Sequence, residues 1–391
     1  MNGLRNLVDK IKPTFEKGGK LGFLHSTFDA FETFLFVPNT VTKKGAHVRD
    51  CVDLKRIMIM VVLALVPAMF FGIWNTGYQH KLAFGLNDWG FWNMVWYGAL
   101  KVIPLYIVAY VVGLAIEFIS AQINGHEVNE GYLVSGMLIP LIVPVDVPLW
   151  MLAIAVAFAV IIGKEVFGGT GMNIWNPALL TRAFLFFSYP SKMSGDTVWT
   201  GGVTRYMADG TAFQCGNGLV DGFSGATPLA NPTLANLEPQ FMDMVLGTIP
   251  GSVGETSVIA ILLGAILLLW TGVASWKIMA SSVIGGLAVG YLGYAVGATD
   301  LPGYYQLVMG GFLFGTVFMA TDPVTSAQTE GGKWIYGFLV GALAVTVRIW
   351  NPGYPEGMML AILLMNTFAP LIDHYVISFS IKRRAKKVTI A

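Results

Sequence analysis

Residues 57–76 read Ile-Met-Ile-Met-Val-Val-Leu-Ala-Leu-Val-Pro-Ala-Met-Phe-Phe-Gly-Ile-Trp-Asn-Thr and contain no charged side chain. An apolar stretch of about 20 residues is long enough to cross a lipid bilayer as a helix. The whole chain of 391 residues has the same character, because 55% of its residues are hydrophobic and only 12% are charged. That is about half of the charge found in soluble proteins. The sequence therefore predicts a polytopic membrane protein and excludes a disordered chain or a disulfide-bonded scaffold.

Nine more apolar segments follow the first one along the chain. The third and the fifth segment are short and carry Gly or Pro, which is typical of broken or re-entrant helices around a site within the membrane. We therefore predict an all-α protein with about ten transmembrane helices. The segments are 57–76, 100–122, 131–145, 148–166, 177–189, 256–273, 277–297, 304–321, 334–349 and 356–380.

Positive charge is concentrated at the two ends of the chain. Of the 24 Lys and Arg residues, ten lie in residues 1–56 and five lie in residues 382–387. The positive-inside rule therefore predicts that both termini are cytoplasmic, which agrees with an even number of spans. Residues 21–37 form an apolar and aromatic stretch that is interrupted by Asp29 and Glu32. This pattern predicts an amphipathic helix on the bilayer or on a partner subunit, or else a small cytoplasmic cap. The net charge of +1 gives no indication of a nucleic-acid partner.

A short repeat relates the two halves of the chain. Ile174-Trp175-Asn176-Pro177 precedes the fifth segment, and Ile349-Trp350-Asn351-Pro352 precedes the tenth. The ends of the third and the eighth segment are also similar, with Asp146 between Pro144 and Pro148 and Asp322 before Pro323. Five spans per half would give the halves opposite orientations, so we predict two inverted five-helix repeats, over 57–189 and 256–380. In the simpler interpretation, Asn-Pro only caps and starts helices.

The longest segment of low hydrophobicity, 190–255, separates these repeats and is expected outside the cytoplasm. A loop of this length is usually functional or disordered. It contains Asp221-Gly222-Phe223-Ser224-Gly225-Ala226-Thr227. Taken alone, Ser-Gly-Ala-Thr predicts a turn. The remaining divisions are a cytoplasmic region at 1–56 and a basic cytoplasmic tail at 381–391.

This loop motif is similar to the one at which a periplasmic flavin transferase joins FMN to a threonine hydroxyl by a phosphoester. The similarity implies that Thr227 is the acceptor and that Asp221, Gly222, Ser224, Gly225 and Ala226 form the recognition sequence.

Motifs elsewhere in the chain extend the resemblance over about residues 1–388. They resemble the NqrB/RnfD family, and within it the NqrB subunits of the Na⁺-translocating NADH:quinone oxidoreductases. The RnfD subunits of the related Rnf ferredoxin:NAD complexes share the flavin motif but usually lack such a long N-terminal region, so they are the second choice. The motifs lie at residues 42–50, 163–171, 176–179, 182–187 and 354–359.

The resemblance implies a function in respiration. It implies a subunit of an NADH:ubiquinone reductase in the bacterial inner membrane that has six subunits, NqrA to NqrF, and exports Na⁺. Electrons would pass from a flavin on NqrC to the covalent FMN, then to a non-covalent riboflavin and finally to quinone. From the residues themselves, the chain has no dinucleotide-binding fingerprint after a strand. Its two cysteines, Cys51 and Cys215, are expected on opposite sides of the membrane and cannot hold an iron–sulfur cluster, so we expect no metal site.

The resemblance also selects candidate contacts for the redox groups. Asn173, Asn176 and Asp322 are candidates for riboflavin, since amide groups offer both donors and acceptors to a flavin edge. Helix capping is the alternative role of these residues. The region of Gly113 is implied in quinone binding.

Acidic residues within apolar spans are candidates for an ion path because burying a charge is costly. Glu117 and Asp373 occupy such positions, and the alternative is that both are solvated at the membrane interface. Arg182 also borders a span, and we expect it to extend to a lipid headgroup. The alternative is that it neutralises the anionic semiquinone of a flavin.

Two other classes of protein compete with a redox subunit. The ten-span inverted repeat resembles that of urea channels, which suggests a solute transporter, and a purely structural anchor would bind no chromophore. A flavin acceptor at Thr227 would distinguish the redox subunit from both.

Overall fold

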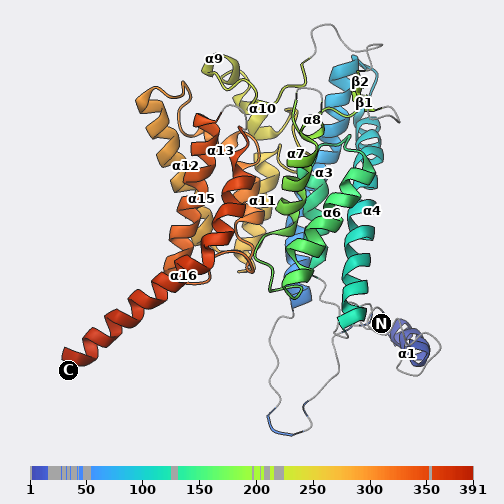
Figure 1. Ribbon diagram of the computed structural model, residues 1–391. Helices are drawn as coiled ribbons and strands as arrows, with labels where there is room; N and C mark the ends of the chain where they lie inside the picture. Colours follow the sequence, from blue (N-terminus) through green and yellow to red (C-terminus); the bar gives the residue numbers. More distant parts are fainter. Residues whose placement is uncertain are drawn as a thin grey trace.

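The computed structural model describes a helical body (Figure 1). The described residues are 2–15, 54–124, 131–195, 198–202, 204–206, 212–214, 224–351 and 355–390, together with Phe28, Glu32, Phe36, Thr42 and 44–46. Most of the predicted amphipathic helix at 21–37 lies outside these residues. Near it, α1 spans Asn2–Phe15.

Within the described ranges, six helices are long and apolar enough to cross a membrane. Three shorter apolar helices pack among them, and the predicted segment 304–321 consists of α13, α14 and the π-helical turn η3. Every one of the ten predicted segments thus contains helical residues, while ten complete crossings stay a prediction. The long helices are α3 (Leu54–Phe84), α4 (Phe91–Asn124), α6 (Leu149–Gly163, continued by η2, Glu165–Phe167), α12 (Trp276–Val296), α15 (Glu330–Trp350) and α16 (Gly357–Ile390). The shorter pieces are α5 (Tyr132–Ile142), α7 (Pro177–Ser188), α11 (Val258–Trp270), α13 (Tyr305–Val308), α14 (Phe312–Phe314) and η3 (Gly315–Met319).

The short helix α5 ends inside the body for a local reason. Pro140 lies in its last turn, and Val143 after it is extended. The carbonyl of Leu141 therefore lacks a helical partner, and it accepts a hydrogen bond from the backbone N–H of Gly254 at 2.8 Å. Irregular backbone at membrane depth requires such a protein partner.

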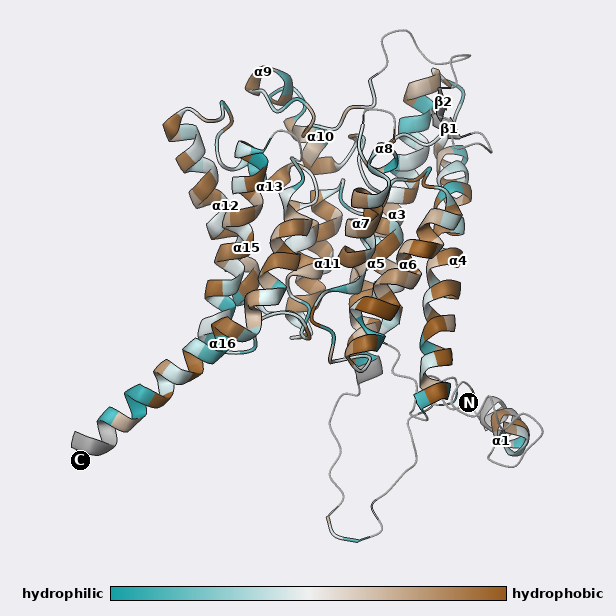
Figure 2. Cartoon of the chain, viewed as in Figure 1, coloured by the Kyte–Doolittle hydropathy of each residue, from teal (hydrophilic) through white to brown (hydrophobic). Residues whose placement is uncertain are grey.

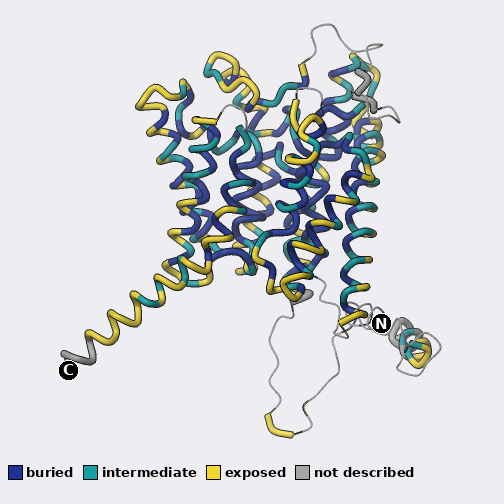
Figure 3. The backbone as a smooth tube through the Cα atoms, viewed as in Figure 1, coloured by how far each residue is buried: buried dark blue, intermediate teal, exposed yellow. Residues whose placement is uncertain are grey.

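The outer surface of the helices is apolar, as Figure 2 shows for their middle sections. On α4, Trp96, Ile107 and Val111 are 69%, 57% and 63% exposed. A continuous apolar exterior indicates contact with lipid. The interior is equally apolar, and buried backbone fills the centre of the body in Figure 3.

One hydrophobic core joins the two halves of the chain. It contains Leu138 and Leu152 from the first half and Phe314, Val345 and Ile362 from the second. Glycines permit the closest helix contacts: a side chain at Gly341 in α15 would overlap the backbone of Ser282 in α12. Small residues at such crossings are typical of membrane helices.

The described residues of the loop 190–255 form short elements at one end of the body, here named the loop end. The opposite end, where α3 begins and α16 finishes, is named the terminal end (Figure 1). A short antiparallel pair of strands, β1 and β2, lies in this loop, while the membrane body is helical as predicted. The loop elements are α8 (Pro190–Met193), β1 (Thr204–Tyr206), β2 (Ala212–Gln214), α9 (Leu234–Leu237) and α10 (Phe241–Leu246).

The repeated Asn-Pro motif has two different local structures. Asn176 is the N-cap of α7, whereas Asn351 is the C-cap of α15. The two asparagines lie at opposite ends of the body. Asn176 lines a pocket together with Ile57, near the start of α3. Pro355, four residues after Asn351, lines another pocket together with the loop residue Thr227. This placement agrees with the predicted inversion, but an inverted five-helix repeat stays a prediction.

Candidate functional site

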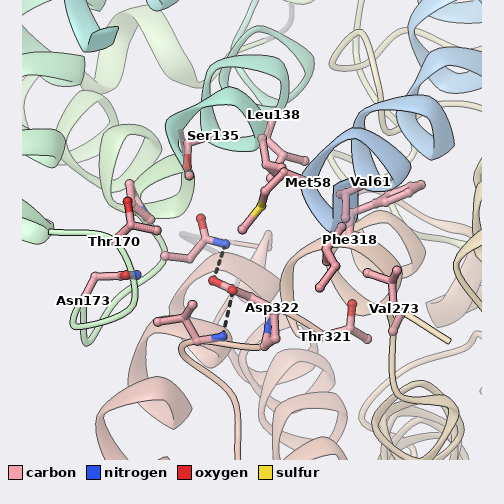
Figure 4. A pocket seen from close by; sticks show the side chains of 18 of the residues that line it. Met58, Val61, Ser135, Leu138, Thr170, Asn173, Val273, Phe318, Thr321 and Asp322 are labelled. Atoms are coloured by element: carbon pink, nitrogen blue, oxygen red, sulfur yellow. Dashed lines mark hydrogen bonds between the residues drawn. The ribbon is translucent and has the colours of Figure 1, made fainter. Parts of the chain in front are cut away.

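The predicted riboflavin residues lie together in one pocket at the terminal end (Figure 4). Asn173, Asn176 and Asp322 all line this terminal-end pocket, together with Lys164 and Ser135. Asn176 donates from Nδ2 to the Asp322 carboxylate at 3.4 Å, across 146 residues of sequence. Asp322 also accepts from the Val324 backbone N–H at 3.1 Å. The sequence separation shows that tertiary packing, rather than local structure, assembles this polar group.

Helix capping, the alternative role, is also present in these side chains. The Asn176 side-chain oxygen accepts from the backbone N–H groups of Ala178 and Leu179 at 2.9 and 3.3 Å, so it caps α7. Pro177 at the first helical position completes a typical start. Asn173 donates to the carbonyl of Trp175 at 3.1 Å.

The terminal-end pocket is narrow in this conformation. Its volume is about 80 Å³, below the range of about 300–1,000 Å³ that is usual for small-molecule sites. Its polar side chains suit the edge of a flavin, but a tricyclic ring would require the pocket walls to separate.

Glu117 is buried and paired, not solvated. Its carboxylate contacts the Lys164 ammonium group, and both side chains are 4% exposed. Neither group makes a well-directed hydrogen bond among the described residues. Lys164 also lines the terminal-end pocket. The lysine therefore connects the predicted ion-path residue in α4 to the pocket.

Gly113 lies one turn before Glu117 and is packed against an aromatic ring. A side chain there would overlap the ring of Tyr132, whose hydroxyl donates to the Ala109 carbonyl at 2.9 Å. In this structure the glycine allows α5 to approach α4.

Asp373 caps the start of α15 from α16. Its carboxylate accepts from the backbone N–H groups of Gln328 and Thr329 at 2.7 and 3.0 Å and from the Thr329 hydroxyl at 2.5 Å. It lies at the terminal end and does not meet Glu117, so these two ion-path candidates form no common site here.

Thr227 lies in the wall of a second pocket, at the loop end. This loop-end pocket has a volume of about 270 Å³ and is also lined by Phe186 and Trp199. The carbonyl of Thr227 accepts from the Ala230 N–H at 2.9 Å, which fixes a turn just after the motif. Of the motif, Ser224, Gly225 and Ala226 are described, and Asp221 and Gly222 lie outside the described residues.

A buried charge cluster forms the base of the loop-end pocket. Arg182 contacts the carboxylates of Glu255, at 2.7 Å, and Glu356, and it is only 3% exposed. The prediction that it extends to a lipid headgroup is therefore wrong, because Glu255 at the end of the loop and Glu356 in the second half pair with it inside the protein. Glu356 directly precedes α16.

Sequence analysis missed Glu255 and Glu356 as members of these sites, and it considered Lys164 as a ligand or as a partner of Glu165 but did not predict its pairing with Glu117. Each is a charged residue at a boundary of an apolar segment, where solvation is the default expectation. One sequence feature could have indicated the pairing. The partners Glu117 and Arg182 also lie at boundaries of apolar segments, but this position does not specify which charged residue pairs with which.

These features define a polytopic membrane protein with buried ionisable groups, a class that includes transporters and membrane redox subunits. Within this class, the sequence profile of the NQR2, RnfD, RnfE family matches residues 41–382. The chain therefore belongs to that family.

Individual relatives are similar along their whole length. NqrB of Pseudomonas paraeruginosa, a subunit of the Na(+)-translocating NADH-quinone reductase, is 45% identical, and the match covers 98% of both chains. The proteins of the same name from Ectopseudomonas mendocina and Chromohalobacter salexigens are 45% and 43% identical, over 98% of this chain and 98% and 97% of theirs.

Proposed function

We propose that this chain is the electron-carrying membrane subunit of a Na⁺-translocating NADH:quinone reductase, with FMN joined to Thr227 and riboflavin in the terminal-end pocket. Full-length similarity to NqrB proteins supports the complex and the enzyme class. The observation that carries the flavin proposal is Thr227, in a matching motif at the wall of a pocket. When bound, FMN would supply one- and two-electron redox chemistry.

The loop-end pocket suits an aromatic group tethered at Thr227. Phe186 and Trp199 provide aromatic wall, and the hydroxyl of Thr256 in the same lining is buried without a hydrogen-bond partner among the described residues. Such an unsatisfied hydroxyl calls for a ligand or a water molecule. Thr227 would hold the phosphoester, and its neighbours of small size would leave the hydroxyl accessible.

At the opposite end, Asn173, Asn176 and Asp322 would hold riboflavin after the pocket opens. The Gly113 region next to Tyr132 would contribute to quinone binding. In this arrangement the two flavin sites lie at opposite ends of one helical body, so electrons would cross most of the membrane within this subunit.

Glu117 and Asp373 are proposed to serve Na⁺ passage. Because Glu117 is paired with Lys164, a sodium ion could bind there only when the ammonium group moves away. Asp373 holds three hydrogen-bond donors, so a cation there would likewise compete with existing bonds.

The proposed setting is the inner membrane of a bacterium. Both termini would be cytoplasmic and the loop end periplasmic, where a flavin transferase would modify Thr227. The partners would be NqrA, NqrC, NqrD, NqrE and NqrF, with the flavin-bearing NqrC as the electron donor. An RnfD subunit of an Rnf complex is the second candidate, because the matching family includes RnfD.

Covalent flavin on the denatured polypeptide tests this proposal. The chain is expressed with its flavin transferase, and wild type and Thr227→Val are compared by flavin fluorescence on a denaturing gel. We expect a fluorescent wild-type band and a dark variant band at equal protein. Thr233→Val, outside the motif on the same loop, is the control and should stay fluorescent. A dark wild-type band would refute the redox function and favour a solute channel.

A further inference from the structure

An open groove lies on the outer surface of the body between α12 and α15. It has a volume of about 340 Å³, and its lining is almost entirely apolar. Ile284 of α12 and Ile335 of α15 are 50% and 47% exposed there. Because the exterior of the helices is apolar and faces lipid, this α12–α15 groove is open to lipid chains rather than to water. Its lining residues are Ser281, Ile284, Trp334, Ile335, Phe338 and Leu339.

The groove follows from the close crossing of the two helices. A side chain at Gly337 of α15 would overlap the Ser281 hydroxyl, and one at Gly285 of α12 would overlap the backbone carbonyl of Phe338. Small residues allow such an approach of two membrane helices. Ser281 is buried at this crossing, while the larger side chains around it are partly exposed. The small residues therefore form the floor of the groove, and the larger side chains form its walls.

Both helices enter the membrane from the terminal end (Figure 1). Ala274, two residues before α12, lines the terminal-end pocket, and Asp373 at the same end caps the start of α15. The first turn of α12 has no side-chain cap among the described residues. The positive ends of two helix dipoles thus lie close together at the outer end of the groove, where they favour an anion.

Three charged side chains lie at this outer end. Lys277 of α12 and Lys333 of α15 both contact the carboxylate of Glu330, Lys333 at 2.8 Å. The Glu330 side chain is 67% exposed. Two lysines against one glutamate leave a charge of +1. Each ammonium group has three N–H donors, and Glu330 accepts from one of them on each lysine, so donors remain for a second anion.

A series of contacts joins these charges to the groove. The Lys277 Nζ lies 5.9 Å from the centre of the Trp276 ring. That ring meets Trp334, a wall of the groove, edge to face at a centroid distance of 5.6 Å. The hydroxyl of Ser281, on the floor, donates to the backbone carbonyl of Lys333 at 3.4 Å. Tryptophans are typical of the boundary between lipid headgroups and acyl chains. The lysines therefore lie at headgroup level, and the groove leads from them toward the acyl chains.

We propose that an anionic phospholipid binds here, with its phosphate at Lys277 and Lys333 and one acyl chain in the α12–α15 groove. From Lys277 to Ile284 the helix rises by about 10 Å, which is about two thirds of the roughly 15 Å of one hydrocarbon leaflet. The cation of a zwitterionic headgroup would lie beside two lysines, so a headgroup with net negative charge is favoured. Basic pockets between membrane helices bind such lipids in other proteins.

This inference goes beyond the proposed function and does not depend on it. It uses only the membrane class of the protein and the contacts of α12 and α15. A covalent flavin at Thr227 and a lipid in the α12–α15 groove are measured separately, so either proposal can fail while the other stands.

Native mass spectrometry of the delipidated full-length chain tests the proposal. The chain in detergent is titrated with phosphatidylglycerol or with phosphatidylcholine of the same acyl chains. One basic residue near an anionic lipid surface contributes about five-fold in affinity. We therefore expect the first phosphatidylglycerol to bind wild type at least about five-fold more tightly than the first phosphatidylcholine.

Charge variants locate the headgroup. Lys277→Gln and Lys333→Gln should each lower the affinity for phosphatidylglycerol about five-fold and leave that for phosphatidylcholine unchanged. Glu330→Gln removes the carboxylate that competes with the phosphate and should raise the affinity several-fold, an effect that a purely structural glutamate would not give. Lys382→Gln, exposed on α16 at the same end, is the control and should change neither affinity.

A groove variant locates the acyl chain. Ile284→Trp fills the α12–α15 groove and should weaken the binding of both lipids several-fold. Leu292→Trp places the same bulk on an exposed position further along α12, outside the groove, and should bind both lipids as wild type does. If Ile284→Trp does not accumulate, the charge variants decide.

Two results would overturn the proposal. One is equal affinity of wild type for the two lipids, and the other is a preference that Lys277→Gln and Lys382→Gln reduce alike. In either event bulk lipid or a helix of a partner subunit covers the groove.

Discussion

The buried pair of Glu117 and Lys164 permits a quantitative test of what holds α4 and α6 together. We consider Lys164→Met, Glu117→Gln and the double variant. Each single change leaves the other side chain buried, and both are 4% exposed. Two unit charges 4 Å apart attract by about 4 kcal/mol at an effective dielectric constant of about 20.

Removing one partner of the pair should therefore lower the free energy of unfolding far more than removing both. Loss of one member of a buried ion pair typically costs about 3–5 kcal/mol, while replacing the whole pair by well-packed neutral groups is often near neutral. We expect each single variant to fall in that range and the double variant to recover most of the loss. The coupling energy, which is the sum of the two single-variant losses minus the loss of the double variant, would then be at least about 5 kcal/mol.

Unfolding in mixed micelles of increasing SDS content, followed by tryptophan fluorescence, measures these differences. Lys277→Met is the control, because Lys277 pairs with an exposed glutamate, Glu330, and such surface pairs contribute about 0–1 kcal/mol. The buried pair would be refuted if each single variant lowered the free energy of unfolding by less than about 1 kcal/mol and the double variant by the sum of the two. Solvated charges would give this result because they are nearly independent.

Two further predictions concern helix contacts. Gly113→Ala should displace the Tyr132 ring and lower the free energy of unfolding by about 1–3 kcal/mol, which is the usual cost of overpacking. The same unfolding assay measures this loss, and an unchanged midpoint would show that the ring moves freely. Asn176→Ala should lower the free energy of unfolding by two contributions. The lost helix cap contributes about 1 kcal/mol, and the loss of a hydrogen-bond donor to the carboxyl of Asp322 contributes about 1–3 kcal/mol more. Asn176→Ser, which can restore only the cap, should recover the smaller part, and full recovery would contradict the bond to Asp322.

Local sequence patterns predicted the elements well because burial in lipid requires long apolar segments. The predicted segments 57–76, 100–122 and 277–297 coincide with parts of α3, α4 and α12, the last to within one residue. Asn176 followed by Pro177 likewise predicted a helix start correctly, since a cap involves only neighbouring residues.

Pairing between distant residues could not be predicted in the same way. Arg182 was expected to contact a lipid headgroup. Instead it pairs with Glu255 and Glu356, which lie 73 and 174 residues later in the chain. Hydropathy reports how costly it is to bury a charge, and it carries no information about which other charge will offset that cost.

The sequence by itself determined the membrane class, the positions of the apolar helices and the motif around Thr227, because each depends on composition or on adjacent residues. Only the tertiary structure placed Asn176 beside Asp322, and Glu117 beside Lys164. These contacts depend on how the helices cross, and the crossing is set by packing of a shared core rather than by any local pattern.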